Sequence, residues 1–188
     1  MKTMNNKTKS SKKLSTFLEK ADLHKKDFAQ MVGVTLSYVY NLIDDTIPFS
    51  TRSATLERIA VVMDIKPEDF AEYRIPQEPI LVDEAVEFFK KKQNDLKMTT
   101  VQFLRAFPRK KRIDIVDMMR GALPVPIDWN ELKIIGNVLQ ISSKELYPYW
   151  KNRVKSVLKT AGLNLRENQG LVDSMLDCAE KFIQTQTE

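Results

Sequence analysis

Apolar residues recur along this chain at spacings of three and four, which is the period of one face of an α-helix. Between positions 14 and 73 they form five short groups, which predict five short helices. We expect Gly33 to end the second helix in a left-handed conformation, Thr35 to cap the third, and Pro67 to open the fifth. The predicted inner faces of the first four helices are Leu14, Phe17, Leu18 and Ala21; Phe28, Ala29 and Val32; Val39, Leu42 and Ile43; and Leu56, Ile59, Ala60 and Met63.

The same apolar pattern returns without a gap 76 residues later, with position 28 falling on position 104. The matched positions are apolar, while the positions predicted to be exposed differ almost everywhere. This pattern is typical of one fold used twice for two different surfaces. The pairs include Phe28 with Leu104, Met31 with Phe107, Val39 with Ile115, Leu42 with Met118, Leu56 with Leu132, Ile59 with Ile135, Met63 with Leu139, and Phe70 with Leu146.

The repeat predicts an all-α chain with two tandem five-helix domains and additional C-terminal helices. We expect the first domain at residues 14–74, a proline-containing linker at 75–82, a degenerate second domain at 83–150, and packing or dimerisation helices at 151–188. The last segment carries a broad apolar stripe, which we expect to pack on the second domain. The alternatives are pairing with the same stripe of another subunit and docking of a protein partner. The stripe consists of Leu171, Val172, Met175, Leu176, Ala179, Phe182 and Ile183.

Composition narrows the classes of function. The 188 residues are 43% apolar and 29% charged, as in an ordinary globular protein. Because no apolar run approaches the roughly 18 residues that span a bilayer, we expect a cytoplasmic protein without a membrane partner. A single cysteine excludes an intrachain disulfide, and a single histidine argues against a zinc site. Since no nucleophile–base set or paired carboxylates are recognisable, we expect neither enzymatic activity nor a cofactor.

The net charge of +5 is unevenly distributed. Residues 1–13 contain five lysines and no acidic residue, so the rest of the chain is neutral. We expect this segment to be a mobile basic arm, because it is too polar to bury a core. Such an arm can follow a phosphate backbone or enter a minor groove, and the alternative is a merely solubilising terminus.

The second predicted helix, the glycine turn and the third predicted helix are the parts of a DNA-reading helix-turn-helix. Residues 23–70 resemble the lambda-repressor-like, or xenobiotic-response-element, helix-turn-helix family. The matching letters are Phe28-Ala29, Met31-Val32-Gly33-Val34, Val39, Leu42, Pro48, Leu56-x-x-Ile59-Ala60-x-x-Met63-x-Ile65 and Pro67-Glu68-Asp69-Phe70. The resemblance implies that the third helix reads bases of double-stranded DNA. It also implies binding as a homodimer or with both tandem domains.

The resemblance carries over to two groups of residues. Lys25 and Lys26 stand where the family usually places a phosphate-contacting glutamine, and Thr51 and Arg52 are expected to hold the backbone across the groove. The third helix has no Arg or Lys, and the carboxylates of residues 44–45 at its end would repel phosphate. Its candidate contacts are Thr35, Leu36, Ser37, Tyr38 and Asn41, of which Asn41 is suited to adenine.

A basic run is the strongest charge feature of the second copy. It consists of Arg109, Lys110, Lys111 and Arg112, and it stands at the start of the helix equivalent to the third. One interpretation is contact with phosphates or guanine edges. The alternative is a solvated face with ion pairs such as Lys110 with Asp114. Because cations at a helix N-terminus are unfavourable, we expect something to offset their cost.

These observations predict a sequence-specific DNA-binding transcriptional regulator, of the kind of a phage or plasmid repressor. The alternative is a non-enzymatic interaction or scaffold protein that uses the same fold to dock a protein partner.

Overall fold

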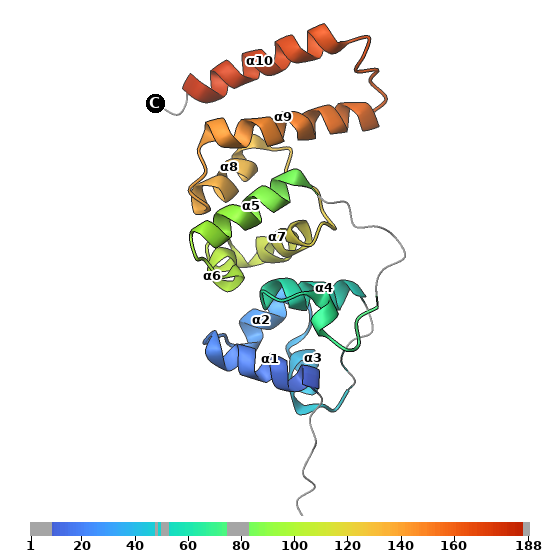
Figure 1. Ribbon diagram of the computed structural model, residues 1–188, viewed down its shortest axis with the longest axis vertical. Helices are drawn as coiled ribbons and strands as arrows, with labels where there is room; N and C mark the ends of the chain where they lie inside the picture. The colour runs from blue at the N-terminus through green and yellow to red at the C-terminus, as the bar shows by residue number, and fades with distance from the viewer. Residues whose placement is uncertain (1–8, 48, 50–52, 75–82, 186–188) are drawn as a thin grey trace, which may run out of the picture. The chain divides into compact units, whose positions relative to one another are not determined.

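A computed structural model describes residues 9–47, 49, 53–74 and 83–185 (Figure 1). All regular structure in these ranges is helical, which confirms the predicted all-α class. Two 3₁₀ turns, η1 and η2, accompany the α-helices. The elements are α1 (Lys9–Lys20), α2 (Lys25–Val32), α3 (Leu36–Asp44), α4 (Ser53–Val62), η1 (Pro67–Asp69), α5 (Glu84–Asp95), α6 (Thr100–Arg105), η2 (Arg109–Lys111), α7 (Arg112–Met119), α8 (Trp129–Val138), α9 (Ser143–Thr160) and α10 (Gln169–Thr185).

The chain forms two compact units, each built from two separate segments. The first unit combines Met1–Leu81 with Lys97–Leu123, and the second combines Val82–Leu96 with Pro124–Glu188. Helices α6 and α7 therefore belong with α1–α4, whereas α5 belongs with α8–α10. These units do not follow the predicted boundaries at 14–74 and 83–150.

The turn between α2 and α3 forms as the sequence predicts. Gly33 ends α2 at φ 74°, in the left-handed region that a residue without Cβ enters readily. Thr35 then caps α3, because its hydroxyl accepts a hydrogen bond of 3.1 Å from the backbone N–H of Tyr38. The inner faces of both helices are buried, with Phe28, Val32, Val39 and Leu42 fully inaccessible to solvent.

Replacing Gly33 with alanine is expected to destabilise the first unit. A Cβ at this position would carry the cost of a left-handed residue and would lie 2.1 Å from Cδ1 of Ile113, which must move. We expect a loss of about 2 kcal/mol in the free energy of unfolding. Gly162→Ala is the matched control, because Gly162 has φ 90° and no neighbouring atom within 4 Å of its Cβ position. Urea denaturation followed by circular dichroism should show the larger loss for Gly33→Ala, and equal losses would contradict the contact with Ile113.

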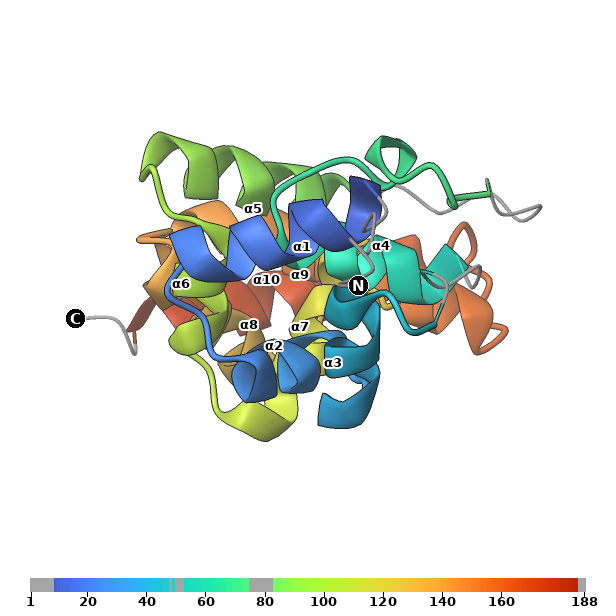
Figure 2. The same ribbon diagram turned by 90° about the horizontal axis from the view of Figure 1, so that it is seen from below.

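Helices α6 and α7 complete the first unit by packing on α2 and α4. Figure 2 shows α7 beside α2. Asp64, in the turn after α4, accepts hydrogen bonds from the backbone N–H (3.0 Å) and the hydroxyl of Thr100 at the start of α6. Ile113 of α7 covers the glycine turn between α2 and α3. The segment 97–123 is therefore an integral part of the unit that contains α3.

An ion-pair network joins α4 to α7. Asp117 accepts two hydrogen bonds of 2.7 Å from the guanidinium of Arg58 and a third of 2.7 Å from Arg120. Arg120 also donates to Glu57 at 2.7 Å, and Glu57 accepts from the hydroxyl of Tyr73 at 3.1 Å. Burial and the hydrogen bond to Glu57 raise the pKa of Tyr73 to about 12. Because Glu57 and Asp117 are both buried, the network fixes α7 on α4 in one arrangement.

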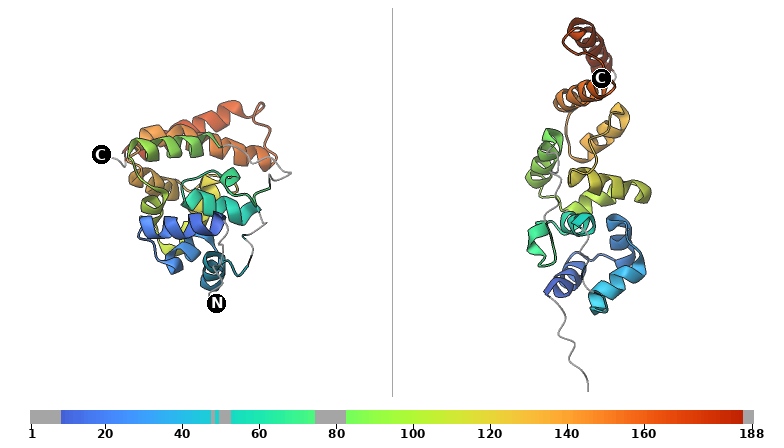
Figure 3. Two further views of the ribbon diagram at one scale, coloured as in Figure 1. Left: turned by 60° about the horizontal axis from the view of Figure 1, so that its bottom comes forward. Right: turned by 90° about the vertical axis from the view of Figure 1, so that its right-hand side faces the viewer.

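The second unit is an α-helical stack built on α9. Phe88 of α5 stacks on Tyr149 of α9 with ring centroids 4.9 Å apart, and Lys92 of α5 pairs with Glu145 at 2.7 Å. Helix α10 packs along α9, as Figures 1 and 3 show. The hydroxyl of Tyr147 in α9 donates to the carbonyl of Leu176 in α10 at 2.6 Å.

The helices of the predicted repeat begin at equivalent positions. Helices α3 and α7 start at 36 and 112, and α4 and α8 start at 53 and 129, so that both offsets equal 76. Both members of the pairs named above are buried. These facts agree with an internal repeat, but the contacts distribute the second copy over both units. Two tandem domains therefore stay a prediction.

Three local predictions differ from the structure. Within the predicted mobile arm 1–13, residues 9–13 belong to α1, because Ser11 is buried and donates a hydrogen bond of 2.6 Å to the carbonyl of Leu42. Residues 1–8 lie outside the described part of the chain. The predicted fifth helix is the single turn η1, which Phe70 ends in an extended conformation. The basic run 109–111 forms the 3₁₀ turn η2 rather than the start of α7.

Candidate nucleic-acid interface

Helix α3 presents an exposed face of mixed character. Leu36 is 39% exposed and Tyr40 is 45% exposed, and Ser37 between them is also exposed. Leu36 and Ser37 stand four and three residues before Tyr40, so the three lie on one side of the helix. Asn41 is half-buried beside them. This face offers a hydroxyl, an amide, a phenol and an aliphatic chain, which suit hydrogen bonding to base edges and contact with a thymine methyl.

The two tyrosines of α3 differ in exposure. Tyr38 was the candidate contact, but it is half-buried, whereas Tyr40 is the more exposed ring. The helical period could have identified Tyr40, because it stands four residues after Leu36 and one before Asn41. We therefore add Tyr40 to the candidate interface.

The N-terminus of α2 borders this face. The ammonium of Lys25 lies 5.0 Å from the ring centroid of Tyr40, a cation–π distance that links α2 to α3. Lys26 is exposed one residue further along. A helix N-terminus with two lysines favours an anion such as a backbone phosphate. The two lysines and the exposed side of α3 thus form one continuous surface.

Helix α7 does not present the equivalent face. Its five successive residues Ile115, Val116, Asp117, Met118 and Met119 are buried, since α7 packs on α2 and α4. The face that would read bases in the second copy is therefore used for packing inside the first unit. The alternative interpretation, a solvated face, does not extend to Asp117, which is 9% exposed and pairs with two arginines.

The basic run leaves its charge at the surface beside α2. Arg109 has a 63% exposed side chain and lies 3.4 Å from the carboxylate of Asp27, in the first turn of α2. Lys110 is exposed. Arg112 is half-buried and donates a hydrogen bond of 3.1 Å to the carbonyl of Phe107. Burial lowers the pKa of Arg112, Asp27 raises it, and the nearby Arg109 and Arg105 lower it again.

Cations at the N-terminus of a helix are unfavourable, and Asp27 offsets part of this cost for the basic run. Its carboxylate neutralises one charge and is itself favourably placed in the first turn of α2.

The remaining predicted residues divide into two groups. Thr35 acts as the N-cap of α3, with its side chain exposed. Thr51 and Arg52 lie outside the described residues.

The fold and this surface can be compared with known proteins. The family model described as the Cro/C1-type HTH DNA-binding domain matches residues 13–75. Residues 13–75 are thus similar to Cro/C1-type helix-turn-helix DNA-binding domains. This match confirms the resemblance stated from the sequence, and it supports a DNA-binding regulator. A search of curated proteins and a search of solved structures found no match.

The Cro/C1-type domain ends, by this match, before α6 and α7 begin. The helices that complete its packing therefore come from a part of the chain that the family model does not cover. Families of this kind are typically non-enzymatic. Among the described residues, no cluster of His, Cys, Asp and Glu could hold a metal ion, and no helix is long and apolar enough to cross a membrane.

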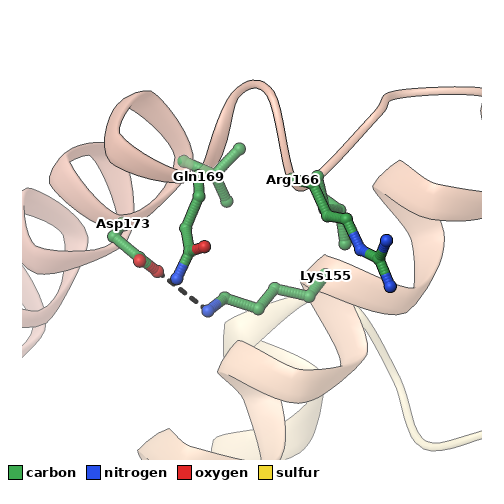
Figure 4. A pocket seen from close by; sticks show the side chains of 6 residues that line it. Lys155, Arg166, Gln169 and Asp173 are labelled. Carbon is green, nitrogen blue, oxygen red and sulfur yellow. Dashed lines mark hydrogen bonds and ion pairs between the residues drawn. The ribbon is translucent and has the colours of Figure 1, made fainter.

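Two of the hollows on the described surface lie between α9 and α10 and along α1. One of about 160 Å³ lies where α9, α10 and the loop between them meet (Figure 4). Lys155 points across it to Asp173, with the ammonium and carboxylate 2.8 Å apart. A second, open hollow of about 520 Å³ lies along α1 and is lined by apolar side chains and by Lys9, Lys12, Lys13 and Lys20. Neither brings together groups that would perform catalysis.

Proposed function

We propose that this chain is a sequence-specific DNA-binding transcriptional regulator in which α3 reads bases. The observation that carries the proposal is the match of residues 13–75 to a Cro/C1-type DNA-binding domain whose α3 has a solvent-exposed outer face. Ser37, Tyr40 and Asn41 would contact base edges in the major groove. Lys25 and Lys26 would place the N-terminus of α2 against the phosphate backbone. The protein would act in the cellular compartment that contains its target DNA.

We propose repression as its mode of action. A domain that occupies a site by a helix in the major groove blocks access of other proteins to that site without any chemistry. A homodimer would place two copies of α3 on a two-fold symmetric site. The outer side of α10 supports pairing, because Leu171, Met175 and Phe182 are each 64% exposed, while Val172 and Leu176 are buried.

Protein docking is the second candidate function, and one observation favours it. The outer face of α3 carries two large exposed side chains, Leu36 and Tyr40, and no basic residue, and Asp44 at its end is exposed. Such a face suits a partner protein better than it suits phosphates. In that case the domain would be a scaffold, and its affinity for nucleic acid would be weak.

The salt dependence of duplex binding distinguishes the two functions. For a regulator that contacts several phosphates, the logarithm of the association constant falls linearly with the logarithm of salt concentration, with a slope of about −0.9 per contact. We expect fluorescence anisotropy with a labelled duplex, between about 50 and 200 mM salt, to give a slope of roughly −3 or steeper. No binding at about 50 mM salt would favour the docking function.

A further inference from the structure

The η2 turn lies against the N-terminus of α2, although the two are separated by some eighty positions in the sequence. Arg109 of η2 pairs with Asp27 in the first turn of α2 at 3.4 Å. Arg105, at the end of α6, donates a hydrogen bond of 3.1 Å to the carbonyl of Asp22, just before α2. All of these residues belong to the first unit. The basic run and the N-terminus of α2 are therefore neighbours.

Basic residues outnumber acidic ones around this junction. Asp27 contacts Arg109 from α2 with a side chain that is 26% exposed, and Asp114 follows the basic run in the first turn of α7. The basic groups are Lys25, Lys26, Arg105, Arg109, Lys110, Lys111 and Arg112.

We propose that η2 is an accessory phosphate clamp, which binds the backbone of the same duplex that α3 reads. This inference rests on the proposed function and specifies the role of the second copy. Lys25 at the start of α2 contacts Tyr40 of α3, and Asp27 in the same turn contacts Arg109, so the N-terminus of α2 lies between α3 and η2. A duplex placed on α3 with its backbone at the N-terminus of α2 would bring the adjacent phosphates to Arg109 and Lys110.

The clamp explains why the second copy keeps charge but has lost an exposed reading face. Helix α7 is buried on α2 and α4, so it holds η2 in place instead of entering a groove. Contacts made by η2 to phosphates carry no sequence information, but they add affinity and fix the position of the duplex. The footprint on DNA should therefore be one extended half-site per chain rather than two half-sites read by two copies.

The test is a double variant of the full chain, Arg109→Gln with Lys110→Gln. Both side chains are exposed, so the fold should be retained, which circular dichroism will verify. We expect affinity for every duplex to fall by the same factor, about tenfold at roughly 0.1 M salt, and the salt slope to become shallower by about 1.8. The ratio of specific to non-specific affinity should stay unchanged.

Lys144→Gln with Lys159→Gln is the matched control, because it removes the same charge from exposed residues of the second unit. If both pairs reduce the slope equally, the effect is one of net charge, and the clamp is overturned. The clamp is also overturned if the η2 variant keeps the slope of the unmodified chain. In either case, sequence-specific binding by the unmodified chain would leave the proposed function intact. Absence of sequence preference in the unmodified chain would instead overturn the function.

Discussion

Replacing Ser37, Tyr40 and Asn41 together with alanine is expected to weaken binding to the preferred DNA site by about 10²–10³-fold. A good side-chain contact to a base edge contributes roughly 1–3 kcal/mol of discrimination, and three are removed. Affinity for unrelated duplexes should change by less than about threefold, because no charge is altered. Competition titrations with specific and unrelated duplexes measure both effects.

The variant should fold normally, since Ser37 and Tyr40 are exposed and Asn41 is half-buried. Asn152→Ala with Ser156→Ala, on the exposed side of α9, serves as a control that should leave both affinities unchanged. Loss of affinity for all duplexes alike would assign α3 to backbone contact rather than base reading. Full retention of specific affinity would show that α3 is not the reading helix.

Replacing Asp117 with asparagine is expected to lower the free energy of unfolding by about 2–4 kcal/mol. The substitution leaves Arg58 and Arg120, whose side chains are 23% and 14% exposed, without their shared carboxylate. Breaking a buried pair in this way is costly, and the partial exposure of Arg58 places the loss toward the lower end of the usual range. Asp114→Asn, an exposed change on the same helix, should alter stability by less than about 0.5 kcal/mol.

The difference between Asp117→Asn and the unmodified protein should depend on pH. Burial raises the pKa of the Asp117 carboxyl, and the hydrogen bonds from Arg58 and Arg120 lower it by a larger amount. The pKa in the folded state is therefore below its ordinary value. A lowered pKa contributes stability that is present above the ordinary value of about 3.9 and is lost as pH falls through the folded pKa. Urea denaturation should therefore show the full difference near pH 7 and a shrinking one below about pH 4. A difference that is constant with pH would contradict the assigned charge network.

The sequence predicts local structure correctly where the conformation depends only on neighbouring residues. Gly33 and Thr35 lie at the turn and cap that they predict, because both depend only on the backbone of neighbouring residues. The apolar period located the buried positions of both copies. The same rules failed for Pro67, where a first-turn proline opens only a 3₁₀ turn, since the chain becomes extended at Phe70.

The packing of α7 could not be predicted, because periodicity identifies a buried face but not the helix that covers it. The partner of the Asp117 carboxylate, Arg58, lies 59 residues away in the sequence, beyond the reach of any helical spacing rule. The pairing of Arg109 with Asp27 is equally remote in sequence. As a result, the repeat predicts a reading face on the second copy, whereas in the structure that face packs on α2 and α4 and completes the first unit.

The central claim is that α3 of the Cro/C1-type domain reads a DNA sequence. Selection of bound fragments from a random duplex library tests it most directly, with the full chain and the Ser37, Tyr40 and Asn41 alanine variant analysed in parallel. We predict that the unmodified chain enriches one motif and that the variant does not enrich it. A palindromic motif would indicate a homodimer, and a single half-site would indicate one chain per site. Failure of the unmodified chain to enrich any motif, or recovery of the same motif by the variant, would contradict the account.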